Sequence, residues 1–357
     1  MLSTVLLVLA SSSSISQQAL QLHDQIWGEL RVALIDHNTG RAVSARCHLT
    51  DASQQSWIPS GAITYLKPPE HNFIAQTGFR IELPPGSYRL VVEKGPEYLS
   101  ERREIKVPAG ETLNEKIELS RWTDMNALGW FSGDLHNHRD WHEMPQILLS
   151  EDLNLAPTLS TWVWEDKPIL GIPLAQGPAI RYADTTHVYS VFDTEIERLG
   201  PGPGAVCLIG LRSPVQFHGY LLSPPSTQFC ELAHRQGGYV DAEKITWRDS
   251  PVLVALQQVD SVGLVYNSFS PHGVELGWGV NPPEGSVEAG PAGAPLWAMD
   301  IYYKFLNCGF RLPVSAGTAS GVKPTPLGYD RVYVHMPQKF TYPGWFEALK
   351  AGRSFST

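Results

Sequence analysis

The stretch Trp130-Phe131-Ser132-Gly133-Asp134-Leu135-His136-Asn137-His138 is a short apolar segment that ends in Asp-x-His-x-His. Residues two apart on a β-strand project to the same face, so Asp134, His136 and His138 are expected to point together from a strand's end. Two imidazoles and a carboxylate that converge in this way suit a borderline divalent metal. The alternative is a surface turn that carries two histidines by chance. We interpret the three residues as candidate metal ligands.

The composition of the 357-residue chain is that of a globular protein, with 43% hydrophobic and 18% charged residues. The length favours about two domains. A formal net charge of −9 argues against nucleic acids and anionic membranes as main partners. Tryptophans near the motif allow an aromatic-lined cleft, and they are Trp122, Trp130, Trp141, Trp162 and Trp164.

The amino terminus carries the apolar run Leu2–Ala10, followed by four serines. The run is too short to span a bilayer, and it fits the hydrophobic part of a signal peptide that is cleaved before Leu22. No Lys or Arg precedes it, so a frayed terminus or a mis-assigned start is the alternative. We expect a secreted or periplasmic protein with no stable membrane span and with residues 1–21 removed.

Residues 22–121 have the pattern of a small all-β sandwich, because short β-rich runs alternate with Gly/Pro turns. The tripeptide Pro108-Ala109-Gly110 between residues 103–107 and 113–119 is a hairpin signature. No cluster of titratable groups stands out here. We therefore expect an accessory domain without metal ligands.

From residue 122 to residue 357, strand-like and helix-like segments alternate. Such alternation predicts an α/β fold with a mainly parallel sheet or a barrel, and with sites at the carboxyl ends of the strands. The strand-like runs cover residues 186–192, 205–211, 261–266 and 332–334, and the helix-like runs cover residues 224–238, 295–308 and 345–351.

Five further residues are candidates for the site. Glu195 follows a predicted strand, where one carboxylate could face a metal. His234 ends a predicted helix, where it binds a metal or only caps the helix. Glu243 and Lys244 end a short strand, and an active-site role competes there with surface ion pairing. His272 lies in a loop after a buried strand, a position that often carries function.

Several motifs, in this order, resemble the polymerase and histidinol phosphatase (PHP) superfamily of metallohydrolases, and within it the carbaryl-hydrolase-like branch. The match covers roughly residues 128–357, and its motifs are residues 133–139, 195–198, 233–234, 262–263 with Asn267, 315–321 and 349–357. Residues 35–43 and 83–88 are similar to carboxypeptidase-regulatory-like sandwiches.

The PHP resemblance implies a distorted (β/α)7-type barrel whose divalent ions (zinc, manganese or iron, one to three of them) activate water. It implies that His136 and His138 are metal ligands, that Glu195 is a bridging carboxylate and that His234 is a further ligand. Two departures bear on this expectation. The Asp-His pair of the superfamily is missing near residues 161–166, and Thr318-Ala319-Ser320 replaces its late Asp-x-His.

Two functions follow from this sequence. The first is a secreted metal-dependent hydrolase of an ester, amide, carbamate or phosphoester bond in a small-molecule or extracellular substrate. Glu243 or His234 would move the proton, Lys244, Arg139 or Arg181 would stabilise the oxyanion, and His272 would line the site. The second is a catalytically degenerate protein that binds a glycan, a peptide or a partner, as the two departures suggest. The sequence gives no oligomeric state.

Overall fold

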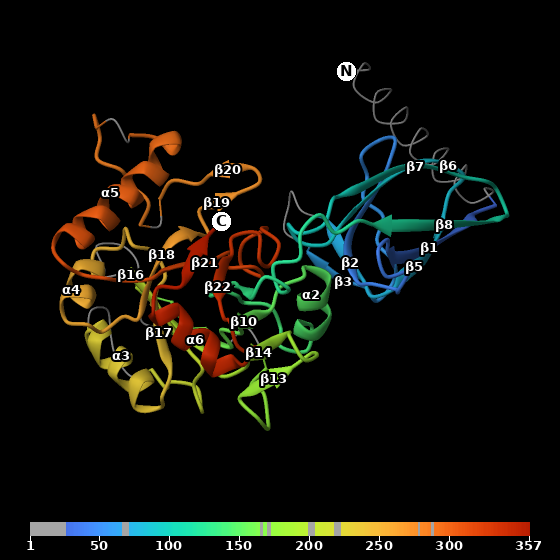
Figure 1. Cartoon of the computed structure of the whole chain (residues 1–357). Helices are drawn as coiled ribbons and strands as arrows, with labels where there is room; N and C mark the ends of the chain where they lie inside the picture. Colours follow the sequence, from blue (N-terminus) through green and yellow to red (C-terminus); the bar gives the residue numbers. More distant parts are fainter. Residues whose placement is uncertain are drawn as a thin grey trace, which may run out of the picture.

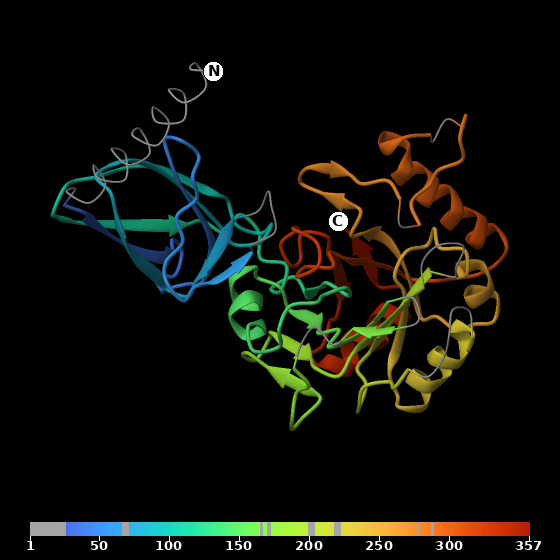
Figure 2. The same cartoon turned by 180° about the vertical axis from the view of Figure 1, so that it is seen from behind.

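The computed structural model describes residues 26–65, 71–164, 167–169, 173–198, 204–217, 223–277, 279–286 and 289–357. The signal peptide expected for residues 1–21 lies outside these ranges. Figures 1 and 2 show two parts, a β-rich part at the amino-terminal end and a larger part that contains the helices. We refer to residues 26–121 as the N-terminal region and to residues 122–357 as the C-terminal region.

Two β-sheets that share one core make up the N-terminal region. Alternate residues of its first strand are buried, as in a strand with one face on a core, and Leu30, Val32 and Leu34 meet Leu90 and Val92 of the facing sheet. The three-stranded sheet has the order β5 (Gly78–Leu83), β1 (Gly28–Asp36) and β8 (Thr112–Leu119). The five-stranded sheet has the order β3 (Ile63–Tyr65), β4 (Asn72–Ala75), β2 (Ala45–Asp51), β6 (Gly86–Glu93) and β7 (Glu101–Val107).

The hairpin predicted at Pro108-Ala109-Gly110 is wrong. Strand β7 pairs with β6, whereas β8 pairs in parallel with β1, so the turn carries the chain from one sheet to the other. Ile105 of β7 and Ile117 of β8 are buried in the same core from opposite sides. A Pro-x-Gly signal therefore identified a chain reversal but not the partner of the strand.

The C-terminal region contains two large mixed sheets and one short hairpin. The six-stranded sheet has the order β13 (Ile180–Tyr182), β14 (Val188–Ser190), β10 (Leu155–Pro157), β9 (Trp130–Gly133), β22 (Val332–His335) and β23 (Ser354–Ser356). The seven-stranded sheet has the order β12 (Lys167–Ile169), β11 (Thr161–Trp164), β15 (Thr194–Arg198), β16 (Gly204–Ile209), β17 (Tyr239–Ala242), β18 (Ser261–Tyr266) and β21 (Val314–Gly317). The hairpin joins β19 (Phe269–Ser270) to β20 (Gly273–Val274).

Helices cover these sheets. Those expected over residues 224–238, 295–308 and 345–351 are present as α3, α5 and α6. The buried residues of α3 recur at helical spacing, and this face packs on β16 and β17. Within the described ranges, no helix is both long and apolar enough to cross a membrane. The α-helices of the described residues are α2 (Met144–Ser150), α3 (Ser226–Arg235), α4 (Ser250–Ala255), α5 (Ala294–Asn307) and α6 (Tyr342–Lys350), and a 3-10 turn covers Pro291–Gly293.

The expected (β/α)7-type barrel, and with it the α/β fold class of mainly parallel strands, is wrong. In the seven-stranded sheet β16 runs antiparallel to both of its neighbours, β15 and β17, and the described strands form open sheets. Only residues 199–203 separate β15 from β16. A parallel pair needs a crossover of a dozen or more residues, usually with a helix, so this connection permits only an antiparallel pair.

The two large sheets pack against each other through one apolar core. Phe131 and Leu155 of the six-stranded sheet meet Ile209 of the seven-stranded sheet in this core. Trp345 of α6 is fully buried there, and its indole N–H donates to the carbonyl oxygen of Phe131 at 2.9 Å. Helices α3, α4 and α5 share a second core with the other face of the seven-stranded sheet. These contacts fix the relative positions of the strands that carry the candidate ligands.

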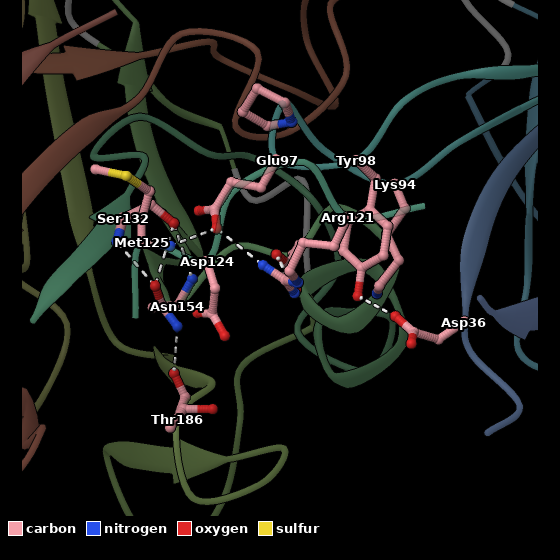
Figure 3. A network of polar contacts seen from close by, with 12 residues as sticks. Asp36, Lys94, Glu97, Tyr98, Arg121, Asp124, Met125, Ser132, Asn154 and Thr186 are labelled. Atoms are coloured by element: carbon pink, nitrogen blue, oxygen red, sulfur yellow. Dashed lines mark hydrogen bonds and ion pairs between the residues drawn. The ribbon is translucent and has the colours of Figure 1, made fainter. Parts of the chain in front are cut away.

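Ion pairs join the N-terminal region to the C-terminal region. Figure 3 shows Arg121 beside Glu97, whose carboxylate also accepts from the backbone N–H of Met125. Arg121 contacts both Glu97 and Asp152 at 2.8 Å. The hydroxyl of Tyr333 donates to Glu97 at 3.1 Å. Arg46 pairs with Glu151 at 2.9 Å. We call this set the inter-region network, and it gives each of these three carboxylates an arginine partner.

Candidate metal centre

The segment after β9 runs beside residues 316–320. Three backbone hydrogen bonds of 2.7–2.9 Å join residues 135–138 to that segment. Its backbone approaches so closely that a Cβ on Gly317 would lie 2.4 Å from the Cβ of His136, so only glycine fits there. His136 and His138 lie on one side of this segment, while Leu135 enters the apolar core.

His136, His138 and Glu195 bring three ligand atoms together. The Nε2 atoms of the two imidazoles lie 3.1 Å apart. The Oε2 atom of Glu195 is 3.4 Å from Nε2 of His136 and 2.9 Å from Nε2 of His138. Glu195 comes from β15 of the seven-stranded sheet, whereas the histidines follow β9 of the six-stranded sheet. Of the residues described, these three form the group whose geometry could hold a metal ion.

The spacing of these three atoms fits a tetrahedral ion. Metal–ligand bonds of about 2.0–2.1 Å in tetrahedral geometry place neighbouring ligand atoms about 3.3 Å apart. The three observed separations range from 2.9 to 3.4 Å. Two imidazoles and one carboxylate are also a ligand set found at catalytic zinc sites, where a fourth position stays open. The residues present therefore fit a divalent metal.

The charges of the cluster also call for a cation. The Oε2 atom of Glu195 is buried and accepts no hydrogen bond of good geometry from the described residues, although both imidazoles adjoin it. Burial opposes the charge on His136, but Glu195 and Glu243 outweigh it and raise the pKa of His136 to about 10. Burial lowers the pKa of His138, despite Glu195. The cluster is thus most stable with a positive charge at its centre.

Behind His136, a carboxylate lies beside the ring. The Nδ1 atom of His136 is 3.2 Å from Oε1 of Glu243, at ion-pair distance but without a hydrogen bond of good geometry among the described residues. Glu243 is held in turn by Lys244 Nζ and Trp247 Nε1, each 2.7 Å from its Oε2. A carboxylate on the far nitrogen of a histidine fixes the tautomer in which the other nitrogen can bind a metal. Glu243 thus supports a ligand, and Lys244 balances its charge.

The three ligands open onto a cavity of about 300 Å³. Its wall combines apolar side chains with charged ones. Glu197 lies two residues after Glu195 on β15, and its Oε2 accepts from Trp162 Nε1 at 3.0 Å. Burial, together with Glu195 and Glu243, raises the pKa of Glu197 to about 8. Besides the three ligands, the cavity is lined by Trp162, Glu197, Lys244, Asn267, Glu275, Ala319, Val322 and Lys323.

Asp134 does not point at the two histidines, although it shares their spacing. Its carboxylate accepts four hydrogen bonds, from the backbone N–H groups of His136, Thr318 and Gly328 and from the hydroxyl of Thr318, at 2.6–3.1 Å. Strand β9 ends at Gly133, one residue earlier, so the side chain turns toward the loop after β21. Asp134 therefore ties the ligand segment to that loop.

His234 lies on α3 beside the start of β17, at the other end of this strand from Glu243. Its Nε2 is 3.1 Å from Oδ2 of Asp260, which also accepts from the N–H of Val240 near the start of β17. Glu243 follows the other end of that strand, three residues later, or about 10 Å away at 3.3 Å per residue. The structure does not bring His234 to the three ligands.

His272 is exposed in the turn between β19 and β20, and it is absent from the cavity wall. The same hairpin nevertheless brings Glu275 to the cavity, where Lys323 pairs with it at 2.6 Å. Neither residue belongs to a local motif, so sequence reasoning missed both. Glu197 was detectable, because residues two apart on a strand share a face. At the late motif, Ala319 lines the cavity in place of a ligand.

The comparisons with known proteins identify no relative. No family model matches the chain, and no curated protein matches it. Similar solved structures include the Bacillus anthracis TIE protein (12% identity, TM-score 0.22), a group B streptococcus pilus 2b backbone protein (16%, 0.21) and a minor pilin of Streptococcus agalactiae (15%, 0.23). The matches cover 33%, 28% and 28% of this chain and 20%, 43% and 47% of those chains, so this chain spans less than half the length of each. Likeness at these TM-scores supports no conclusion about fold or function.

Proposed function

We propose that this chain is a metal-dependent hydrolase that cleaves an ester, amide, carbamate or phosphoester bond. The observation that carries the proposal is the convergence of His136, His138 and Glu195 on the wall of one cavity. Packing alone gives no reason for two imidazoles and a carboxylate to meet from separate sheets, since unpaired buried polar groups cost free energy. A relation to the PHP superfamily rests on the motif of residues 133–139 and is part of the proposal.

His136, His138 and Glu195 would hold the ion, and Glu243 would keep Nε2 of His136 directed at it. A divalent cation supplies Lewis acidity and an activated water at near-neutral pH. Trp162, Ala319 and Val322 give the cavity apolar surface that excludes bulk water from the bond to be cleaved.

Lys244 contributes a positive charge to the same wall. Its side chain is 2% exposed, and its ammonium group lies 4.9 Å from the ring of Trp247 while it pairs with Glu243. A fixed cation beside the cavity stabilises negative charge that develops on a substrate oxygen. Glu243 is already engaged with His136 and Lys244, so we assign it orientation of the ligand rather than transfer of the proton.

A metal-binding protein without catalysis is the second candidate. The observation that favours it is the loop after β21, where Thr318 bonds to Asp134 and Ala319 offers no ligand atom. Export by a signal peptide at residues 1–21 also belongs to the proposal, and amino-terminal sequencing of the secreted protein tests it.

The test of the proposed function is metal-dependent turnover by the full-length protein. Metal-stripped protein is reconstituted with zinc, manganese or iron and assayed on chromogenic carboxyl esters, aryl amides and carbamates, and phosphoesters. We expect turnover that needs the metal and that is lost in the His136→Ala/His138→Ala variant. Metal binding without turnover supports the second candidate, and failure to bind any of the three metals contradicts both.

A further inference from the structure

Arg139 directly follows the ligand His138 and reaches across to the N-terminal region. Its Nη1 donates to the carbonyl oxygen of Thr64 at 3.0 Å, and its guanidinium carbon lies 4.8 Å from the centre of the Tyr65 ring. Its Nη2 contacts Glu143 at 2.6 Å. Thr64 and Tyr65 belong to β3, an edge strand of the five-stranded sheet. The residue next to a ligand is therefore held by the other region of the molecule.

The opposite side of the same segment is held by the loop after β21. A Cβ on Gly321 would lie 2.8 Å from the carbonyl carbon and oxygen of His138 and 3.0 Å from the nitrogen of Arg139. The N–H of His138 donates to the carbonyl oxygen of Ser320 at 2.8 Å. The ligand segment thus lies between this loop and strand β3.

We propose that Arg139 is a positioning residue through which the N-terminal region becomes part of the metal centre. This inference rests on the proposed function, because it assumes that His136, His138 and Glu195 bind a metal. Arg139 touches no ligand atom. It fixes the backbone that directs the His138 imidazole toward Glu195, and β3 supplies the surface on which Arg139 is anchored.

The other contacts between the two regions offer a matched comparison. Arg46 also comes from the N-terminal region and pairs with the buried Glu151, which follows α2. Arg46 and Arg139 each bridge the two regions, but only Arg139 adjoins a ligand in the chain. Replacing Arg46 therefore loosens the interface without acting on the backbone of residues 136–139.

The direction in which metal affinity changes after removal of Arg139 distinguishes a positioning role from a purely electrostatic one. Arg139 carries a positive charge near a site for a cation, so its removal by itself should strengthen metal binding. Loss of positioning should weaken it, because groups that orient metal ligands typically contribute 10–100-fold to affinity. A weaker affinity after Arg139→Met is therefore not explained by the loss of charge.

The experiment measures the zinc dissociation constant of full-length wild type, Arg139→Met and Arg46→Met by competition with a chelator, with thermal unfolding of each protein beside it. We expect Arg139→Met to weaken zinc binding by roughly 10–100-fold and Arg46→Met to lower the unfolding temperature while leaving zinc affinity unchanged. Tyr65→Leu, which loosens the anchor without altering the charge at position 139, should weaken zinc binding in the same direction. If Arg139→Met does not fold, the zinc affinity of Tyr65→Leu tests the inference in its place.

Three results overturn the inference. Equal losses of affinity in Arg139→Met and Arg46→Met would mean that any loosening of the interface acts on the site. Unchanged affinity in Arg139→Met and Tyr65→Leu would mean that the N-terminal region takes no part. If wild-type protein binds no zinc, manganese or iron, the proposed function fails as well. Zinc binding by wild type with no effect of Arg139→Met removes this inference alone.

Discussion

The inter-region network and the metal centre both bury ionisable side chains, but they balance charge in different ways. In the network, Arg121 contacts Glu97 and Asp152, and Arg46 contacts Glu151. In the metal centre, the three ligand atoms are all potential lone-pair donors, and one of them accepts no hydrogen bond of good geometry in the described part of the chain.

This difference separates a structural role from a binding role. A buried carboxylate with a fixed arginine beside it needs no further ligand, and removing the arginine leaves the carboxylate unpaired at a cost. A group of converging acceptors is stable only when a proton or a cation joins it. Buried charge alone therefore does not identify a site, whereas several lone-pair donors that converge without a fixed counterion indicate one.

The largest effect should come from removing the two imidazoles. His136→Ala/His138→Ala leaves one of the three ligands, so bound metal should fall from about one ion per chain to almost none. Elemental analysis after dialysis measures it. The matched control is His37→Ala/His142→Ala, which removes two exposed histidines that pair with Glu118 and Asp140. Equal metal contents in the two double variants would rule out the ligand assignment.

The second-largest effect is expected for Arg121→Met, and it should change the stability of the protein rather than its metal content. The arginine faces two carboxylates, so its loss should reduce the free energy of unfolding by about 3 kcal/mol, as measured by denaturant titration. Metal content should stay at the wild-type level. Arg103→Met is the control, because Arg103 is half exposed and its pairing with Glu101 should contribute little. If Arg121→Met loses metal while its free energy of unfolding is unchanged, the inter-region network and the metal centre do not have separate roles.

Glu243→Gln should have an intermediate effect on the metal. The amide cannot hold the His136 ring as a carboxylate does, so metal affinity should fall by roughly 10–100-fold, as measured by chelator competition. Glu275→Gln is the control, since Glu275 lines the same cavity but pairs with Lys323. Similar losses in both variants would mean that the net charge of the cavity, and not the orientation of His136, sets the affinity.

His234→Ala should have the smallest effect. Its contact with Asp260 lies at a partly exposed site, so the free energy of unfolding should change by less than about 1 kcal/mol. Metal content should not change. A loss of metal in this variant would restore His234 as a ligand and would contradict its position beside the start of β17.

Local spacing predicted the two histidines, because the alternation of an extended chain is a property of neighbouring residues. It could not predict the side chain of Asp134, because loop residues Thr318 and Gly328, far along the chain, supply its hydrogen bonds. Glu195 was suggested by its position beside a strand, but its contact with the histidines depends on how two sheets pack. Lys323 and Glu275 carry no local signal, since their pairing is made only by the fold.

The topology of the sheets was the least predictable feature. Strand-like and helix-like runs were identified well enough to give α3, α5 and α6, yet the same alternation suggested parallel strands and a barrel. The short link of residues 199–203 carried the contrary information, since it has no room for a crossover helix. The motifs that resemble the PHP superfamily pointed to His136, His138 and Glu195, but the barrel that the resemblance implied is not formed by the described strands.

The most direct test of the central claim is X-ray absorption spectroscopy of the zinc-loaded, full-length protein. We predict a signal with two imidazole nitrogens and at least one oxygen at about 2.0–2.1 Å and no sulfur ligand, and its loss in His136→Ala/His138→Ala. A zinc ion bound by sulfur at about 2.3 Å, a spectrum without imidazole scattering, or an unchanged spectrum in the double variant would contradict the metal centre.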